Sequence, residues 1–176
     1  MRYERLKDMI VSRQNIARRV GRATVLFLTG AFILLNFAGA ANITITGTWS
    51  RVIGSGDLTG GAGSNLTATY TSATNQITMG LTTSGQQSWR VDVLRIDASW
   101  SASFQLSIIR TNNGTAGSGG VAGGTTYLVI TTTSQTFVTG YGTRSGITLQ
   151  ERLSGVSVSI PAATYTTTIQ YTAVDI

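Results

Sequence analysis

The stretch "LRIDASWSASFQLSI", residues 94–108, indicates the fold class because every second residue along it is apolar. The apolar positions are all even: Leu94, Ile96, Ala98, Trp100, Ala102, Phe104, Leu106 and Ile108. The positions between them are charged or polar: Arg95, Asp97, Ser99, Ser101, Ser103, Gln105 and Ser107. A period of two is typical of a β-strand with one buried face, whereas an amphipathic helix would show a period near 3.6.

The residues just before this stretch have the opposite parity, with Trp89, Val91 and Val93 as the apolar set. The change of parity predicts a β-bulge at Val93–Leu94, where one extra residue would shift the register. We expect residues 87–96 and 101–110 to pair as a hairpin around a turn at 97–99.

Similar alternation recurs beyond residue 41, and no window there shows a helical period. Gly-rich segments separate the runs, which predict about eight or nine short strands. The runs lie at residues 43–45, 66–70, 77–81, 127–131, 135–138, 147–149 and 156–160, besides those above. We therefore predict an all-β fold over residues 41–176, an antiparallel β-sandwich of the immunoglobulin-like kind.

The chain ends in "IPAATYTTTIQYTAVDI", residues 160–176, where Thr and Tyr alternate. Pro161 would end the strand at 156–160, and the residues after the turn would form a long last strand. The order apolar residue, Pro161, turn and Tyr165 predicts a tyrosine corner, in which a phenol binds the backbone of the turn.

Residues 1–40 predict a signal peptide or a membrane anchor that precedes the β domain. The stretch 23–41 is apolar and uncharged, follows seven basic residues, and contains the small-residue sequence Ala38-Gly39-Ala40. This order is typical of a secretory signal, and we expect cleavage after Ala40. The alternative is an uncleaved helix that anchors the protein in a membrane through residues 23–41. Both predict that residues 42–176 lie outside the cytoplasm, either secreted or at the cell surface.

Charge and composition exclude several classes of function. The net charge is +6, but residues 1–40 hold seven basic and two acidic residues, which leaves six Arg and five acids beyond them. Such a balanced domain lacks the basic face that nucleic-acid binding requires. The chain has no His and no Cys, which excludes the common catalytic triads, thiol chemistry and metal sites of the His/Cys kind. We expect no enzymatic activity, no cofactor and no metal.

Sugar hydrolysis would need a pair of carboxylates, and Asp92 and Asp97 are the nearest candidates. Asp92 and Asp97 each follow an arginine two residues earlier, and ordinary ion pairs are the simpler interpretation. Glu151 shares parity with Ile147, Leu149 and Leu153 and can point inward, although we interpret it as a strand end or a bulge.

The tryptophans bear on an alternative function, a secreted carbohydrate-binding module. Trp89 and Trp100 belong to apolar alternating sets and are predicted core residues. Trp49 is less constrained, and if it were exposed with Tyr70 or Tyr141 it would form an aromatic face for a polysaccharide.

The C-terminal stretch "SVSIPAATYTTTIQYTA" resembles the last two strands of bacterial spore-coat-U and fimbrial-subunit domains. The resemblance implies a subunit of a surface fibre that lends an N-terminal strand to a neighbour. The segment 42–53, "NITITGTWSRVI", has the alternation that a lent strand needs, with Asn42, Ile43, Ile45 and Trp49 as its candidate exchange residues. The alternative, which the sequence favours, is that this segment is simply the first strand of its own sandwich.

The sequence thus favours a non-enzymatic extracellular structural subunit of a fibre, pilus, coat or matrix. Its expected partners are copies of itself or another surface protein, and a polysaccharide under the alternative.

Overall fold

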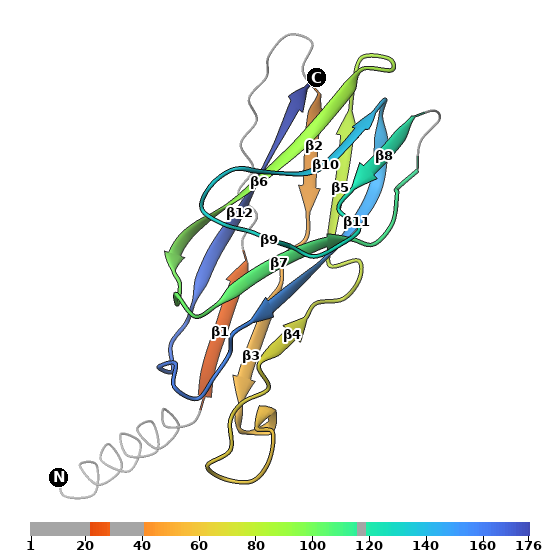
Figure 1. Cartoon of the computed structure of the whole chain (residues 1–176). Helices are drawn as coiled ribbons and strands as arrows, with labels where there is room; N and C mark the ends of the chain where they lie inside the picture. The colour runs from red at the N-terminus through yellow and green to blue at the C-terminus, as the bar shows by residue number, and fades with distance from the viewer. Residues whose placement is uncertain (1–21, 29–40, 116–118) are drawn as a thin grey trace, which may run out of the picture.

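The computed structural model describes residues 22–28, 41–115 and 119–176, and within these ranges the fold is all-β with no α-helix. Figure 1 shows the strands running along an elongated domain. They are β1 (Arg22–Leu28), β2 (Asn42–Thr46), β3 (Ser50–Gly54), β4 (Thr69–Thr71), β5 (Ile77–Thr82), β6 (Ser88–Ser99), β7 (Gln105–Arg110), β8 (Gly120–Gly123), β9 (Leu128–Val129), β10 (Gln135–Tyr141), β11 (Arg144–Ser154) and β12 (Thr166–Asp175), with one 3-10 turn, η1 (Ser55–Asp57).

The described strands form two sheets of six, which confirms the predicted sandwich architecture. Sheet A has the order β3-β1-β12-β6-β10-β8, and sheet B has the order β2-β5-β11-β7-β9 with β4 paired to β11. Every pairing is antiparallel except that of β1 with β12, which is parallel.

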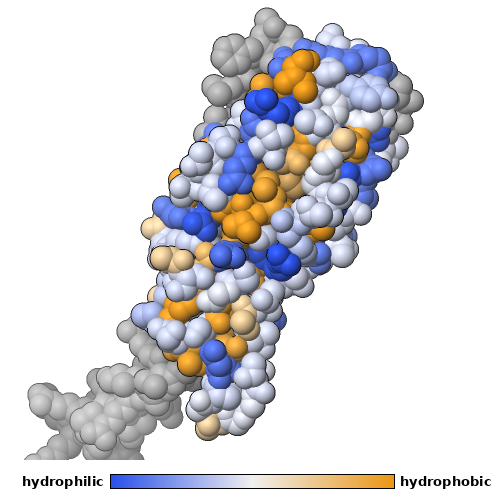
Figure 2. All heavy atoms as spheres, viewed as in Figure 1, coloured by the Kyte–Doolittle hydropathy of each residue, from blue (hydrophilic) through white to orange (hydrophobic). Residues whose placement is uncertain are grey.

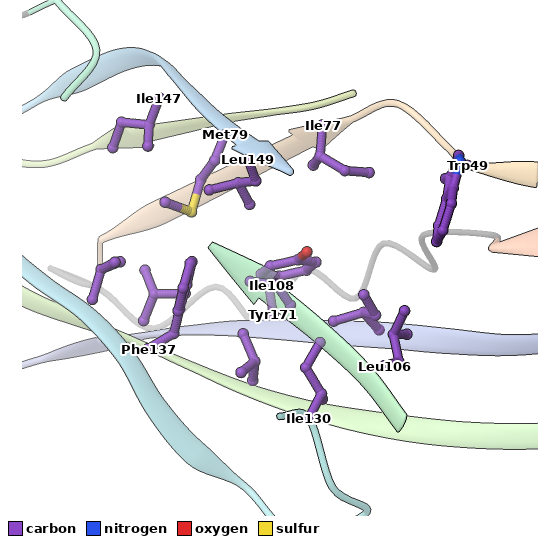
Figure 3. Close-up of a cluster of buried hydrophobic side chains, with 14 of the residues drawn as sticks. Trp49, Ile77, Met79, Leu106, Ile108, Ile130, Phe137, Ile147, Leu149 and Tyr171 are labelled. Carbon is purple, nitrogen blue, oxygen red and sulfur yellow. The ribbon is translucent and has the colours of Figure 1, made fainter. Parts of the chain in front are cut away.

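The core lies between the sheets, and Figure 3 shows apolar side chains from both meeting there. The last strand behaves as its alternation predicts: Thr167, Ile169 and Tyr171 are buried, and the residues between them are half-buried. β12 pairs with β6 along its full length, from Thr166 to Asp175. Fully buried apolar side chains from the two sheets include Ile53, Met79, Leu81, Trp89, Leu106, Ile108, Ile147, Leu149 and Leu153.

The predicted hairpin of residues 87–96 with 101–110 is wrong, because its two strands lie in different sheets. β6 belongs to sheet A and β7 to sheet B, and the chain crosses between them through residues 100–104. Trp100 and Phe104 pack edge to face at this crossing, with ring centroids 5.4 Å apart. Alternation shows only that each segment is a strand, and it does not choose between pairing with the next strand and crossing the sandwich.

The predicted bulge at Val93–Leu94 is also wrong. The register of β6 against β12 is regular there, and it shifts instead near Ala98, where Ser99 and Asp97 face successive residues of β12. The even apolar set accordingly does not continue the core face of β6, and Ile96 is 48% exposed. The outer half of β6 therefore extends past the main core.

Residues 156–160, predicted as a strand, form a turn region instead. Val156 is buried, but Val158 is 57% exposed, and the Ile160 amide donates to the Ser157 carbonyl oxygen at 3.1 Å. The strand before Pro161 is the longer β11, which ends at Ser154.

The leader differs from the predicted helix where the structure describes it. Residues 22–28 are strand β1, and residues 1–21 and 29–40 of the predicted leader lie outside the described residues. No helix in the described ranges is long and apolar enough to cross a membrane.

Candidate assembly site

β1 lies between β3 and β12 and is the only described strand that joins them. It pairs antiparallel with β3 from Arg22 opposite Gly54 to Phe27 opposite Ser50. It pairs parallel with β12 at two positions, with Phe27 opposite Thr166 and Leu28 opposite Thr167. Among the described strands β3 has no other partner, so its place in sheet A depends on β1. We call the position between β3 and β12 the β1 slot.

The β1 slot has the dimensions and chemistry to accept one strand. Neighbouring strands lie about 4.8 Å apart, so removal of β1 would leave β3 and β12 about 10 Å apart. The backbone groups of β12 that pair with β1, at Thr166 and Thr167, would then lack these partners. Such an edge binds an added strand through main-chain hydrogen bonds.

The walls of the β1 slot are anchored in the core. Ile53 of β3 is fully buried, and Thr167 and Ile169 of β12 are buried as well. The Thr167 hydroxyl lies 2.7 Å from Asp97 Oδ1 and 3.0 Å from the Ile96 carbonyl oxygen, which ties this part of β12 to β6. The β12 wall is therefore held in place from the side opposite β1.

Pro161 and Tyr165, the predicted tyrosine-corner residues, lie in the turn that leads into β12. The Tyr165 hydroxyl donates to the Pro161 carbonyl oxygen at 2.9 Å. The Tyr165 ring is buried and packs edge to face on Phe104, with centroids 5.0 Å apart. This contact fixes the direction in which the chain enters β12, next to the residues that pair with β1.

An apolar groove meets the β1 slot at Gly54, the residue opposite Arg22. Its volume is about 420 Å³. Figure 2 shows that apolar side chains form separate patches among polar ones on the face drawn there. The groove is lined by Gly54, Ser55, Leu58, Leu66, Val158, Ser159, Ile160, Pro161 and Ala162.

The predicted exchange segment divides between the two sheets. Asn42, Ile43 and Ile45 lie in β2, an edge strand of sheet B that pairs with β5. Asn42 is exposed, Ile43 is buried and Ile45 is half-buried. Trp49 is buried in the connection to β3. In this structure the segment supplies β2 to sheet B and most of β3 to sheet A of its own sandwich.

The carboxylates considered for catalysis do not form a pair. Arg90 Nε donates to Asp92 Oδ1 at 2.9 Å on β6, and the Thr136 hydroxyl contacts the same oxygen at 3.0 Å. Asp97 forms an ion pair with Arg95 at 2.8 Å. The predicted ordinary ion pairs are therefore confirmed, and Glu151 lies in the other sheet.

Glu151 is fully buried in the middle of β11, which corrects its interpretation as a strand end or bulge. Neither carboxyl oxygen has a hydrogen-bond partner among the described residues, and the same is true of the buried Tyr171 hydroxyl. Burial raises the pKa of Glu151 to about 8, because an ionised carboxylate loses its hydration between the sheets. Burial, with a smaller contribution from Glu151, also raises the pKa of Tyr171 well above its ordinary value. Both groups are therefore neutral at pH 7.

The aromatic residues do not assemble the face that the carbohydrate alternative requires. Trp49 and Tyr70 are buried, and only Tyr141 of the three is exposed. Trp89 is a core residue, and Trp100 is half-buried beneath the Arg95 guanidinium group, 4.6 Å from its ring centroid.

Sequence reasoning missed β1 as a strand, and it missed Asp175 as a contact of Ala41. The stretch "RATVLFL" contains β-branched residues that suit a strand, but its position after a basic region is equally typical of a leader.

Comparison of the chain with protein-family models and with curated proteins gave no match.

Proposed function

We propose that the chain is a non-enzymatic structural subunit, exported from the cytoplasm, that assembles with copies of itself by strand exchange at the β1 slot. One observation carries the proposal: among the described strands, β3 is joined to sheet A through β1 alone, and β1 belongs to the predicted leader. Cleavage after Ala40 would remove β1 and open the β1 slot in every exported copy.

The strand that fills the open β1 slot is β3 of a second copy. β2 pairs with β5 over five register positions and stays in sheet B. β3 would lose the one strand partner it has in the described ranges when β1 leaves, although it still follows β2 in the chain. Ile53 is the one buried residue among the five of β3, and Val52 is 60% exposed, so moving this strand would expose less apolar surface than moving a central strand.

Composition and local contacts support the rest of the proposal. The domain beyond residue 40 is nearly neutral, with six Arg and five acids, whereas the leader holds seven basic and two acidic residues, as expected for a chain oriented outward. The Tyr165–Pro161 hydrogen bond is the contact that an immunoglobulin-like sandwich uses at its tyrosine corner, so we include that finer fold class in the proposal.

Disulfide trapping tests the exchange directly, because the natural chain has no Cys. Ser50 and Thr166 face the same β1 residue from opposite walls of the β1 slot. Each variant carries a single Cys, so any disulfide must join two copies of the chain. The full chain with Ser50→Cys is co-expressed in an exporting bacterium with the full chain carrying Thr166→Cys, and the exported protein is oxidised mildly.

We expect a disulfide-linked heterodimer, and electron microscopy of the same material should show oligomers or filaments. The matched control pairs Ser50→Cys with Thr125→Cys, an exposed position distant in sequence from the β1 slot, and should give no heterodimer. Monomers at every concentration together with no trapped heterodimer would rule the proposed exchange out.

A further inference from the structure

The backbone nitrogen of Ala41 lies against a carboxylate at one end of the sandwich. Its N–H donates to Asp175 Oδ1 at 2.8 Å. Figure 1 shows β2 beginning beside the C-terminal end of β12, so this contact joins the start of sheet B to the end of a sheet A strand. Ala41 itself is only 6% exposed, and the contact is partly buried.

Asp175 differs from the other aspartates of the described domain in its partner. Asp57, Asp92 and Asp97 each form an ion pair with an arginine. Asp175 forms no ion pair within the described ranges, and its side-chain contact is the Ala41 nitrogen. A positive charge on that nitrogen would therefore give every one of these aspartates a cationic partner.

We infer that processing between Ala40 and Ala41 creates an α-ammonium group for which Asp175 is the counter-ion. The inference rests on the proposed function, because it needs an exported chain and a peptidase of the export machinery. Hydrolysis breaks the amide C–N bond: the hydroxyl of one water adds to the Ala40 carbonyl carbon, and a proton goes to the Ala41 nitrogen. The freed amine, whose ordinary pKa is about 8, takes a further proton from solvent at pH 7.

The structure needs no rearrangement to hold this product. The contact of 2.8 Å already has the length of a charge-assisted hydrogen bond between a cationic nitrogen and a carboxylate. Its partial burial reduces screening by salt. The ion pair would fix the start of β2 beside β12, which leaves β3, beyond Gly47 and Trp49, as the strand that is free to exchange.

The sequence makes this amine unusually easy to follow. Lys7 is the only lysine of the chain, and it lies in the leader. A protein that begins at Ala41 therefore has a single primary amine, its own N-terminus. An N-hydroxysuccinimide ester can be used as the probe, because it reacts with the neutral amine and with no side-chain amine in this product.

The experiment uses protein exported from the full chain. Mass spectrometry should give a mature N-terminus at Ala41. Labelling at pH 7 should be slow in the natural protein and about 3- to 10-fold faster in Asp175→Asn, because loss of the counter-ion lowers the amine pKa and one pKa unit changes the neutral fraction tenfold. Asp175→Glu should keep labelling slow, and Asp92→Asn, which removes a different aspartate, should leave the rate unchanged.

Each outcome decides between the two proposals. An exported protein that begins at another residue, or that is labelled as fast as Asp175→Asn and with an ordinary amine pKa, overturns the inference and leaves the proposed function standing. A chain that stays in the cytoplasm with its leader intact overturns both. If Asp175→Asn does not fold, the amine pKa of the natural protein, measured from the pH dependence of labelling, still decides the question.

Discussion

β11 and β12 are both long strands inside their sheets, but their partners come from different parts of the chain. β11 pairs with β5 and β4 on one edge and with β7 on the other, all from the domain beyond residue 40. β12 pairs with β6 along its whole length on one edge, whereas its other edge has only β1, at two register positions. A strand in the middle of a sheet can therefore lose its partner on one edge when that partner belongs to a segment that can be cleaved off.

This difference between the edges of β11 and β12 suggests that the two strands have different roles, one in folding stability and the other in assembly. The edges of β11 are covered by β4, β5 and β7, which belong to the domain beyond residue 40. Under the proposed function, processing would remove the β1 residues that pair with the other edge of β12, and a second copy would add a strand there. We therefore expect substitutions in β11 to change folding stability, and substitutions at the β1 slot to change association.

The largest expected effect concerns Glu151, the buried acid of β11. Its pKa of about 8 in the folded protein exceeds the ordinary value of 4.5. Between these pH values the unfolded state releases the proton and the folded state keeps it, so stability falls as pH rises. The full shift is worth about 5 kcal/mol at about 1.4 kcal/mol for each pKa unit. About 4 kcal/mol of it should be lost between pH 5 and pH 8.5, because the unfolded state is already partly ionised at pH 5. Guanidinium unfolding of the exported protein at pH 5 and at pH 8.5 measures it.

Glu151→Gln should remove this pH dependence because the amide does not ionise. Asp92→Asn should retain it, since Asp92 lies in an ion pair of sheet A. If the natural protein were equally stable at both pH values, Glu151 would not be desolvated and β11 would be more open to water than its burial indicates.

The next prediction compares Ile147 of β11 with Ile53 of β3, which forms one wall of the β1 slot; both side chains are fully buried. Ile147→Ala in β11 should destabilise the exported protein by about 3 kcal/mol, a usual cost for such a cavity. Ile53→Ala in β3 should cost below about 1 kcal/mol in the exported monomer, because β3 has lost its only sheet partner there. Unfolding curves of both variants, with processing verified by mass spectrometry, give the comparison. Equal losses would mean that β3 stays packed after β1 leaves.

The smallest effect concerns the turn before β12. Tyr165→Phe removes the hydroxyl that binds the Pro161 carbonyl oxygen and keeps the ring against Phe104. We expect a loss of about 1 kcal/mol, the usual net contribution of one hydrogen bond. Thermal unfolding should show it, with Tyr141→Phe, at an exposed position, as the unchanged control. A Tyr165→Phe protein as stable as the natural one would show that the ring alone holds the turn.

The sequence by itself determined the fold class and several local contacts. The alternation of Thr and Tyr after Pro161 predicted the long last strand, and the spacing of Arg90 with Asp92 and of Arg95 with Asp97 predicted their ion pairs. These features depend on residues one or two positions apart in a strand, where side chains alternate between the two faces whichever strand lies opposite.

Only the tertiary structure decided which strands pair and what is buried between them. Residues 87–96 and 101–110 were predicted to form a hairpin, but the chain crosses the sandwich between them. Residues 22–28 were predicted to belong to the leader, but they form β1. Glu151 and the Ala41–Asp175 contact likewise depend on elements distant in sequence. The physical reason is that pairing and desolvation are set by whichever strand lies opposite, and a period of two carries no information about that neighbour.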